Sequence, residues 1–247
     1  MKLTVVGCSG SGPGPDSPAS CYLVEADGFR IVLDLGQGAA GPLQGYTVPS
    51  TLGAILISHL HSDHCLDLTA LAVILQYGPT RPRAPIPVHA PRGAARRIAL
   101  ACGPETDEAQ LAGFFDFKEP RDGQIGPFAV TFARMSHPVE TYAVRLEHDG
   151  HTLVYTGDTG PTDALVELSR GADVLLAEAG WGGGSEAVPN LHLTGAAAGE
   201  HATRAGVRRL ILTHVPAWGS VARARAEAQD TFSGRLDMAR AGQVVDI

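Results

Sequence analysis

The segment His59-Leu60-His61-Ser62-Asp63-His64 constrains this chain more than any other feature of its sequence. It follows residues 52–57, an apolar run that is typical of a buried β-strand. Because side chains alternate along a strand, His59 and His61 point to one face. Three of the ten histidines lie here beside a carboxylate, which is typical of a metal site at a strand end. A polar loop of solvated histidines is the weaker alternative, so the sequence predicts a metal site.

The length and composition are those of a globular protein with a sizeable core. The chain has 247 residues, 44% of them hydrophobic, and no apolar run approaches the roughly 20 residues that span a bilayer. No Pro- or Ser-rich linker divides it, so we expect one domain over residues 1–247. The N-terminus leads into an apolar strand without the pattern of a signal peptide, so we expect a cytoplasmic protein with no membrane partner.

Charge and cysteine spacing argue against two further classes. The formal net charge of −7 argues against a scaffold that grips nucleic acid with a broad basic surface. Five arginines between positions 81 and 97 are a local exception, which we interpret as a solvated face rather than a phosphate site. The four cysteines show no CxxC spacing, and a cytosolic chain of this length does not need disulfides, so we do not expect a disulfide-stabilised protein. Cys65 directly follows His64, and we expect it to be a small buried hydrophobe rather than a metal ligand.

Strand-like and helical patterns alternate along the chain. Strands are expected at residues 3–7, 21–26, 30–35, 52–57, 128–135, 141–147, 152–156 and 209–213. Helices are expected at residues 66–77, 164–169 and 194–205, and glycines follow the last two. The pattern predicts an α/β fold with a strand-rich core and helices on both outer faces.

Three further residues stand where a predicted strand gives way to a loop, and they are candidates to complete the metal site. His137 follows the strand at 128–135, Asp158 lies in a Gly-rich turn after 152–156, and His214 follows 209–213. With the first cluster they make five histidines and two aspartates, a mixture suited to two divalent ions that share a bridging carboxylate. Such a carboxylate would offset the repulsion between two dications.

These motifs together resemble the metallo-β-lactamase fold superfamily over essentially the whole chain. The resemblance implies a four-layer αββα sandwich with the site at one edge of the two sheets. It also implies a set of ligands. His59, His61 and His137 would hold the first ion, Asp63, His64 and His214 the second, and Asp158 would bridge them. Zinc suits the imidazole-rich set, although manganese or iron could occupy it.

Further segments look like the phosphodiesterase branch of that superfamily, which includes the tRNA-processing enzyme RNase Z. The opening Gly/Ser-rich residues 7–12 could cradle an anion with backbone amides. Glu178 lies in a stretch similar to the branch's His-Glu-Ala-Thr motif, with Ala177 in place of the His. His192 precedes a helix, as the branch's catalytic His does. By this match His192 would protonate or stabilise the leaving oxygen, and Glu178 would orient His192.

Departures from RNase Z point to a smaller substrate. RNase Z enzymes carry a long tRNA-gripping arm between the third metal His and the bridging Asp, whereas 21 positions separate His137 from Asp158. The first loop also lacks the Arg-Asn pair of that family. The GCSGSGPGPDSPAS opening and the HLHSDHCLDL, LHLTG and LTHVPAW segments most resemble small bacterial phosphodiesterases that hydrolyse cyclic nucleotides such as cAMP.

We therefore expect a phosphodiesterase in which a metal-bridging hydroxide attacks phosphorus, Asp63 orients or deprotonates that nucleophile, and His192 assists the leaving oxygen. The expected partner is a small phosphodiester, and relatives in this branch suggest a homodimer. Alternatives are an RNase Z-like tRNA 3′-endonuclease without the arm, a lactone or thioester hydrolase, an exported β-lactam hydrolase, and a metal-stabilised sensor without turnover. Trp181 and Trp218 lie beside site segments, and either could stack on a base or only anchor a loop.

Overall fold

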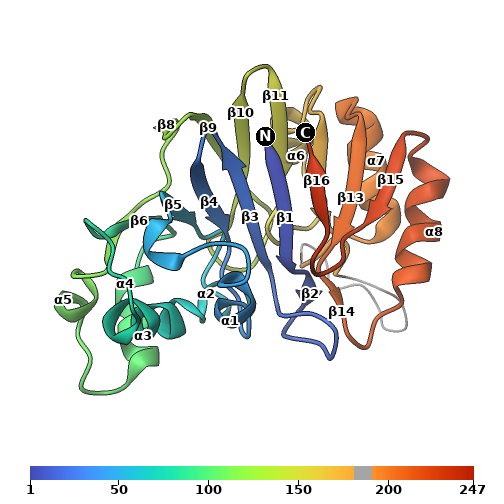
Figure 1. Ribbon diagram of the computed structural model, residues 1–247. Coiled ribbons are helices and arrows are strands. Elements are labelled where there is room, and N and C mark those ends of the chain that lie inside the picture. Colours follow the sequence, from blue (N-terminus) through green and yellow to red (C-terminus); the bar gives the residue numbers. More distant parts are fainter. Residues whose placement is uncertain (181–190) are drawn as a thin grey trace.

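Two β-sheets pack face to face, and helices cover their outer faces (Figure 1). The computed structural model describes residues 1–180 and 191–247. The first sheet has the order β16-β1-β3-β4-β5-β6-β7 and the second the order β15-β13-β12-β11-β10-β9-β8. A short pair, β14-β2, lies at one edge. This arrangement is the αββα sandwich that the family resemblance implied.

The first sheet contains β1 (Lys2–Gly7), β3 (Cys21–Ala26), β4 (Phe29–Leu33), β5 (Ala54–Leu56), β6 (Ile86–His89), β7 (Phe115–Lys118) and β16 (Val244–Asp246). The second contains β8 (Gly123–Ile125), β9 (Phe128–Arg134), β10 (Tyr142–His148), β11 (His151–Tyr155), β12 (Val174–Glu178), β13 (Arg209–Thr213) and β15 (Arg235–Met238). The short pair is β2 (Ser9–Gly10) and β14 (Val215–Pro216). The helices are α1 (Ala40–Leu43), α2 (Ser62–Cys65), α3 (Leu68–Tyr77), α4 (Ala94–Cys102), α5 (Glu108–Leu111), α6 (Asp163–Leu168), α7 (Gly195–Ala205) and α8 (Val221–Thr231), with a 3-10 turn η1 (Pro49–Thr51).

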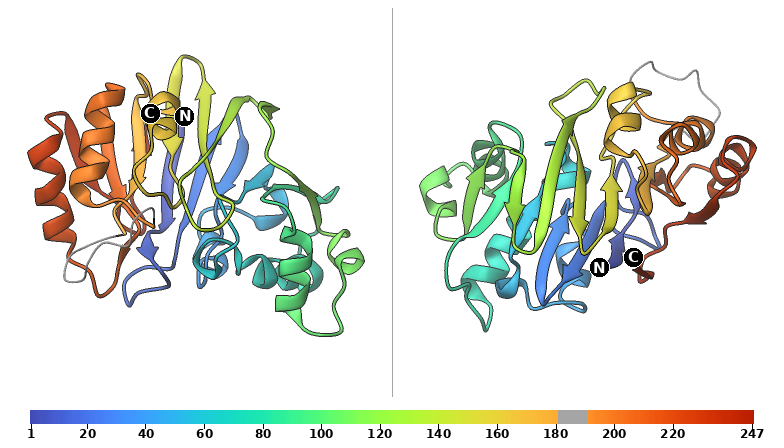
Figure 2. Two further views of the ribbon diagram at one scale, coloured as in Figure 1. Left: turned by 180° about the vertical axis from the view of Figure 1, so that it is seen from behind. Right: turned by 90° about the horizontal axis from the view of Figure 1, so that it is seen from above.

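Three apolar layers hold the sandwich together. Between the sheets, side chains such as Leu3, Tyr22 and Phe128 are almost completely buried. Helices α1, α3, α4 and α5 pack on the outer face of the first sheet, and α6, α7 and α8 pack on that of the second (Figure 2). Because both faces of the central strands are covered, β12 is buried along its whole length. No helix in the described residues combines the length and the apolar composition needed to cross a membrane.

Capping residues set the ends of the helices that follow the second sheet. Thr194 accepts a hydrogen bond from the amide of Ala197 at the start of α7, and Gly206 ends that helix at a φ of 67°. Thr162 caps α6 in the same way. The helices expected at 164–169 and 194–205 are thereby confirmed to within a residue.

Parallel strands direct their carboxyl ends to one edge of the sandwich. β4 to β7 run parallel in the first sheet, and β11, β12, β13 and β15 run parallel in the second. β9 runs in the same direction as β11, since both are antiparallel to β10. The loops that follow these strands therefore meet at one place, which is where α/β folds carry their sites.

Candidate metal centre

The structure brings all seven predicted ligands together at that edge. Their donor atoms form two groups of four, and within each group the atoms lie within 4.8 Å of one another. The first group is His59, His61, His137 and Asp158, and the second is Asp63, His64, Asp158 and His214. Asp158 belongs to both, so the spatial arrangement agrees with the division of ligands that the resemblance implies.

Asp158 faces the two groups with different oxygens. Its Oδ1 lies 3.2 Å from Nε2 of His64 and 3.4 Å from Nε2 of His214. Its Oδ2 lies 3.7 Å from Nε2 of His59. Burial alone would raise the pKa of Asp158, but the imidazoles of His214, His64 and His59 outweigh it and hold the pKa well below its usual value. The carboxylate is therefore an anion placed to bridge two cations.

Unpaired donor atoms show that these residues suit metal ions. Nε2 of His64, Nε2 of His214 and Oδ1 of Asp158 are buried, and despite their short separations none makes a hydrogen bond of suitable geometry in the described part of the chain. Buried polar atoms without partners are costly, and a bound cation would satisfy all three. Burial also lowers the pKa of His214 to about 4, so this imidazole is neutral and its nitrogen lone pair is free for coordination.

The other ring nitrogens of these histidines have partners that fix the ring orientations. Nδ1 of His214 lies 3.0 Å from Oγ of Ser20, and Nδ1 of His137 lies 2.9 Å from the carbonyl oxygen of Leu191. Oγ of Ser58 lies 3.1 Å from Nδ1 of His59. Such outer partners set the tautomer and direct the free nitrogen toward the ion.

Asp34 is a supporting residue that the sequence reasoning did not identify. It is completely buried at the end of β4, and its Oδ2 lies 2.6 Å from Nδ1 of His64. The same oxygen accepts from the hydroxyl of Tyr155 at 2.6 Å, and Oδ1 accepts from the amide of Ser58 at 2.7 Å. Asp34 thus joins a metal ligand to both sheets. The expected strand at 30–35 included Asp34, and a carboxylate within this apolar run was the available signal.

Glu178 and His192 lie next to this centre and contact each other. Nδ1 of His192 is 3.0 Å from Oε2 of Glu178 and 3.8 Å from Oδ2 of Asp158. The Glu178 carboxylate also accepts from the amides of Thr159 and Gly180, at 2.6 and 3.0 Å. The carboxylate is thereby held by backbone and in turn orients the imidazole, the arrangement that the resemblance implied.

The electrostatics of this pair favour a charged imidazole. Burial would lower the pKa of His192, but the carboxylates of Glu178 and Asp158 outweigh it and raise the pKa to about 9. Burial raises the pKa of Glu178 to about 7, partly offset by the attraction of His192. With Nδ1 occupied by the carboxylate, Nε2 is the nitrogen left to face a substrate.

One sequence interpretation, that of the Gly/Ser-rich opening segment, turns out differently. The Gly/Ser-rich segment 7–12 is not a free amide cradle, because the Cys8 amide donates to Oγ of Ser17 and the Ser9 amide to the carbonyl of Pro18. Its Ser9–Gly10 part pairs with Val215–Pro216 instead.

Cys65 is buried and donates to the carbonyl of His61, as expected of a cysteine that is not a ligand. Trp181 lies outside the described residues.

Comparison with known proteins places the chain in a family. Residues 30–215 match the model of the beta-lactamase superfamily domain. The chain belongs to the beta-lactamase superfamily. Within it, the probable metallo-hydrolase YhfI of Bacillus subtilis is 30% identical over 99% of both chains, and a crystal structure of YhfI superposes with a TM-score of 0.87 at 29% identity, covering 99% of this chain and 98% of that one.

Two further relatives extend the comparison. An uncharacterized protein of Mycobacterium leprae is 42% identical, covering 100% of this chain and 89% of its own length. A protein of Mycobacterium bovis named ribonuclease Z is 30% identical, covering 96% of this chain and 95% of its own length. These relatives and the His/Asp cluster identify this beta-lactamase superfamily member as a metal-dependent hydrolase.

Proposed function

We propose that this chain is a dinuclear phosphodiesterase that hydrolyses cyclic nucleotides of the cAMP type. The observation that carries the proposal is the His192–Glu178 pair, in which Nδ1 of His192 lies 3.8 Å from the carboxylate of Asp158, the residue that would bridge two ions. A cationic imidazole beside a site for two dications suits an anionic substrate whose leaving group is an alkoxide. A thioester expels a thiolate, which has less need of such a proton donor, and a lactone carries no anionic phosphate for the cationic imidazole to attract.

The residues have distinct parts in the proposed reaction. Two divalent ions, zinc by the preference of an imidazole-rich set, would supply charge for the phosphate oxygens and lower the pKa of water. Asp63 lies 3.4 Å from Nε2 of His64 and accepts a proton from the attacking water as the new P–O bond forms. His192 gives its proton to the ribose oxygen as the old P–O bond breaks. The phosphodiester becomes a monoester, and no other reactant is consumed.

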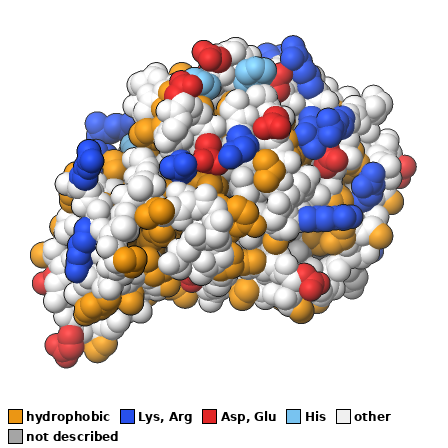
Figure 3. All heavy atoms as spheres, viewed as in Figure 1, with side chains coloured by type: hydrophobic (Ala, Val, Ile, Leu, Met, Phe, Trp, Pro, Cys, Tyr) orange, Lys and Arg blue, Asp and Glu red, His pale blue; other side chains and the backbone are white. Residues whose placement is uncertain are grey.

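A small substrate is favoured over tRNA by the connection between the metal ligands. β10 and β11, which lie between His137 and Asp158, are paired strands of the sheet joined by a two-residue turn, so this connection carries no arm. On the face drawn in Figure 3, Lys and Arg side chains are interspersed with Asp and Glu rather than gathered in one basic surface. A polyanion would find little to hold it on such a surface.

A second candidate is a nuclease related to RNase Z, because a relative with that name is 30% identical to this chain.

One panel of substrates separates a cyclic-nucleotide phosphodiesterase, a nuclease, and a hydrolase of thioesters, lactones or β-lactams. Bis-p-nitrophenyl phosphate should be hydrolysed by the metal-loaded protein, while a thioester, a lactone and a β-lactam should not. Cleavage of precursor tRNA without cleavage of cyclic nucleotides would favour the nuclease. Hydrolysis of the thioester or lactone alone would reject both phosphodiester proposals.

A further inference from the structure

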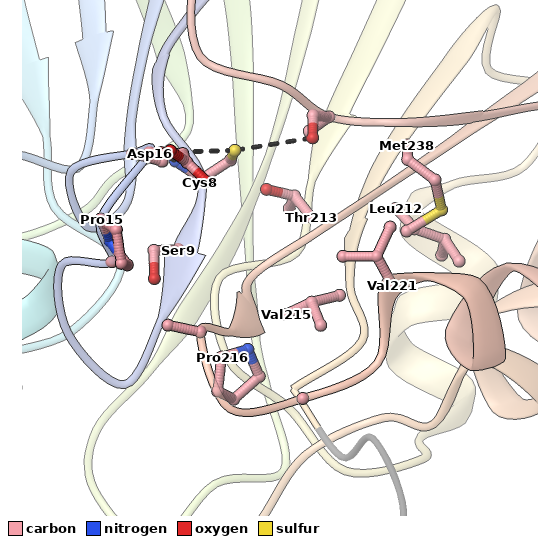
Figure 4. Close-up of a pocket in the computed structure, with 15 residues that line it drawn as sticks. Cys8, Ser9, Pro15, Asp16, Leu212, Thr213, Val215, Pro216, Val221 and Met238 are labelled. Atoms are coloured by element: carbon pink, nitrogen blue, oxygen red, sulfur yellow. Dashed lines mark hydrogen bonds between the residues drawn. The ribbon is translucent and has the colours of Figure 1, made fainter.

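A cavity of about 290 Å³ lies beside the metal centre and takes no part in the chemistry described above. Figure 4 shows Ser9 and Pro15 of the first loop facing Val215, Pro216, Val221 and Met238 across it. Two of its lining residues, Thr213 and Val215, flank the metal ligand His214 in sequence. The cavity and the metal centre therefore share one stretch of backbone.

The walls are mostly apolar, with one unsatisfied polar atom. Leu212, Val215 and Met238 are at most 9% exposed and contribute aliphatic surface. Ser9 is 6% exposed, and its Oγ has no hydrogen-bond partner among the residues that the structure describes. A buried hydroxyl without a partner is unfavourable, and a bound group with a complementary atom would satisfy it.

The polar groups next to Ser9 already have partners within the protein. Sγ of Cys8 donates to the carbonyl of Ala239 at 3.6 Å, and Oγ of Ser17 donates to the carbonyl of Pro18 at 2.9 Å. The hydroxyl of Thr213 lies 2.6 Å from that of Tyr22. Among the buried side chains of the lining, hydrogen bonding is therefore left to Ser9, and the exposed Asp16 adds a carboxylate acceptor at the rim. This lining suits a mainly apolar occupant with polar groups at its edge.

The size of the cavity and the residues at its edge restrict further the kind of ligand that it can bind. A volume of 290 Å³ is at the lower end of small-molecule sites, at about 300 Å³, so it suits one ring system rather than an oligonucleotide. Trp218 does not itself line the cavity, but it lies in sequence between the lining residues Ala217 and Gly219, and 78% of its surface is exposed. The amide of Gly219 donates to the carbonyl of Pro216 at 2.7 Å, so a tight turn presents the indole. A flat, exposed indole is a stacking surface for a flat ring.

We propose that this cavity binds a purine base, with Ser9 hydrogen-bonded to an edge of the ring. The base has two possible sources, a cyclic nucleotide held at the metal centre or a separate free nucleoside. Only the first source rests on the proposed function, since a nucleoside without phosphate binds the cavity whatever reaction the metal centre catalyses.

Adenosine is the probe, because it carries the base and lacks the phosphodiester. Calorimetric titration into the metal-loaded full-length protein should show saturable binding. The Ser9→Ala variant should weaken it about tenfold, as expected for one lost hydrogen bond. The Val221→Trp variant, which fills the cavity from its half-exposed rim, should abolish it. The Ser50→Ala variant is the matched control, because the Ser50 hydroxyl donates to Thr80 and lines a different cavity.

Metal content and circular dichroism of each variant verify folding. Absence of binding at millimolar adenosine, or equal affinity in Ser9→Ala, Val221→Trp and wild-type protein, would overturn the proposal. If adenosine binds and raises the KM for cyclic nucleotide, the cavity holds the base of the substrate. If it binds without changing that KM, or if cyclic nucleotides are not hydrolysed at all, the cavity holds a separate nucleoside.

Discussion

Nδ1 of His192 lies 3.0 Å from Oε2 of Glu178, and this contact links the loop before α7 to the end of β12. Backbone amides of Thr159 and Gly180 hold the same carboxylate. The imidazole is therefore positioned by a rigid strand end, although it stands on a loop. This arrangement makes the role of His192 separable from that of the metal ligands.

Replacing His192 with Ala should lower turnover of a phosphodiester by about 10²- to 10⁴-fold, the usual contribution of a general acid. The change removes the proton donor and leaves all seven predicted ligands in place. Turnover is measured alongside metal content by elemental analysis. Wild-type turnover at full metal content would remove His192 from the mechanism.

Replacing Glu178 with Gln should shift the alkaline limb of the pH–rate profile to lower pH. The carboxylate is the main cause that raises the pKa of His192, so its neutral analogue lets that pKa fall. The reaction requires a protonated His192, so activity is lost as the pH rises through the pKa of His192. In the variant this loss should begin at a lower pH. Both profiles are recorded at equal metal loading. Superimposable limbs would contradict the coupling.

Replacing Asp34 with Asn should weaken metal affinity by roughly 10- to 100-fold, the usual effect of removing an outer partner of a metal-bound imidazole. The 2.6 Å contact to Nδ1 of His64 then involves a neutral amide, which no longer increases the basicity of the ring. Competition with a chromogenic chelator measures the affinity.

The control for that experiment is Asp67→Asn. The Asp67 carboxylate accepts from the amide of Ala40 rather than from an imidazole. Equal losses of affinity in the two variants would indicate general destabilisation rather than a specific role of Asp34.

Replacing Gly10 with Ala should lower activity at least about tenfold and reduce stability by about 1–3 kcal/mol, the range for overpacking. A Cβ at Gly10 would lie 2.1 Å from the carbonyl oxygen of His214, so the backbone of a metal ligand must move. Gly41→Ala is the control, since a Cβ there meets nothing within 4 Å. Activity assays and thermal unfolding compare the two variants, and an unperturbed Gly10→Ala would refute the close approach.

Much of this fold was predictable because local signals and global structure agree. Apolar runs identified several central strands, and the glycines that follow them marked the ends of α6 and α7. The HxHxDH segment and three strand-end residues named the seven candidate ligands whose donor atoms the structure brings together. Strand ends are informative because parallel strands direct them to one edge.

Other features depend on contacts between residues far apart in the chain. Asp34 meets Tyr155 across 121 positions, and Ser20 meets His214 across 194. The cavity behind β14 is built from the first loop and the end of β15, which no local pattern connects. The strands β7, β8 and β16 stand at sheet edges and lacked the apolar signal of central strands. The strands β6, β12 and β15 were also not predicted, although β12 is apolar and buried along its whole length.

The central claim is tested most directly by hydrolysis of 3′,5′-cAMP with zinc- or manganese-loaded protein, beside an Asp63→Ala variant. The account predicts conversion to the 5′- or 3′-monophosphate by the wild-type protein and loss of that activity in the variant. Failure of the loaded wild-type protein to hydrolyse cAMP or bis-p-nitrophenyl phosphate would contradict it.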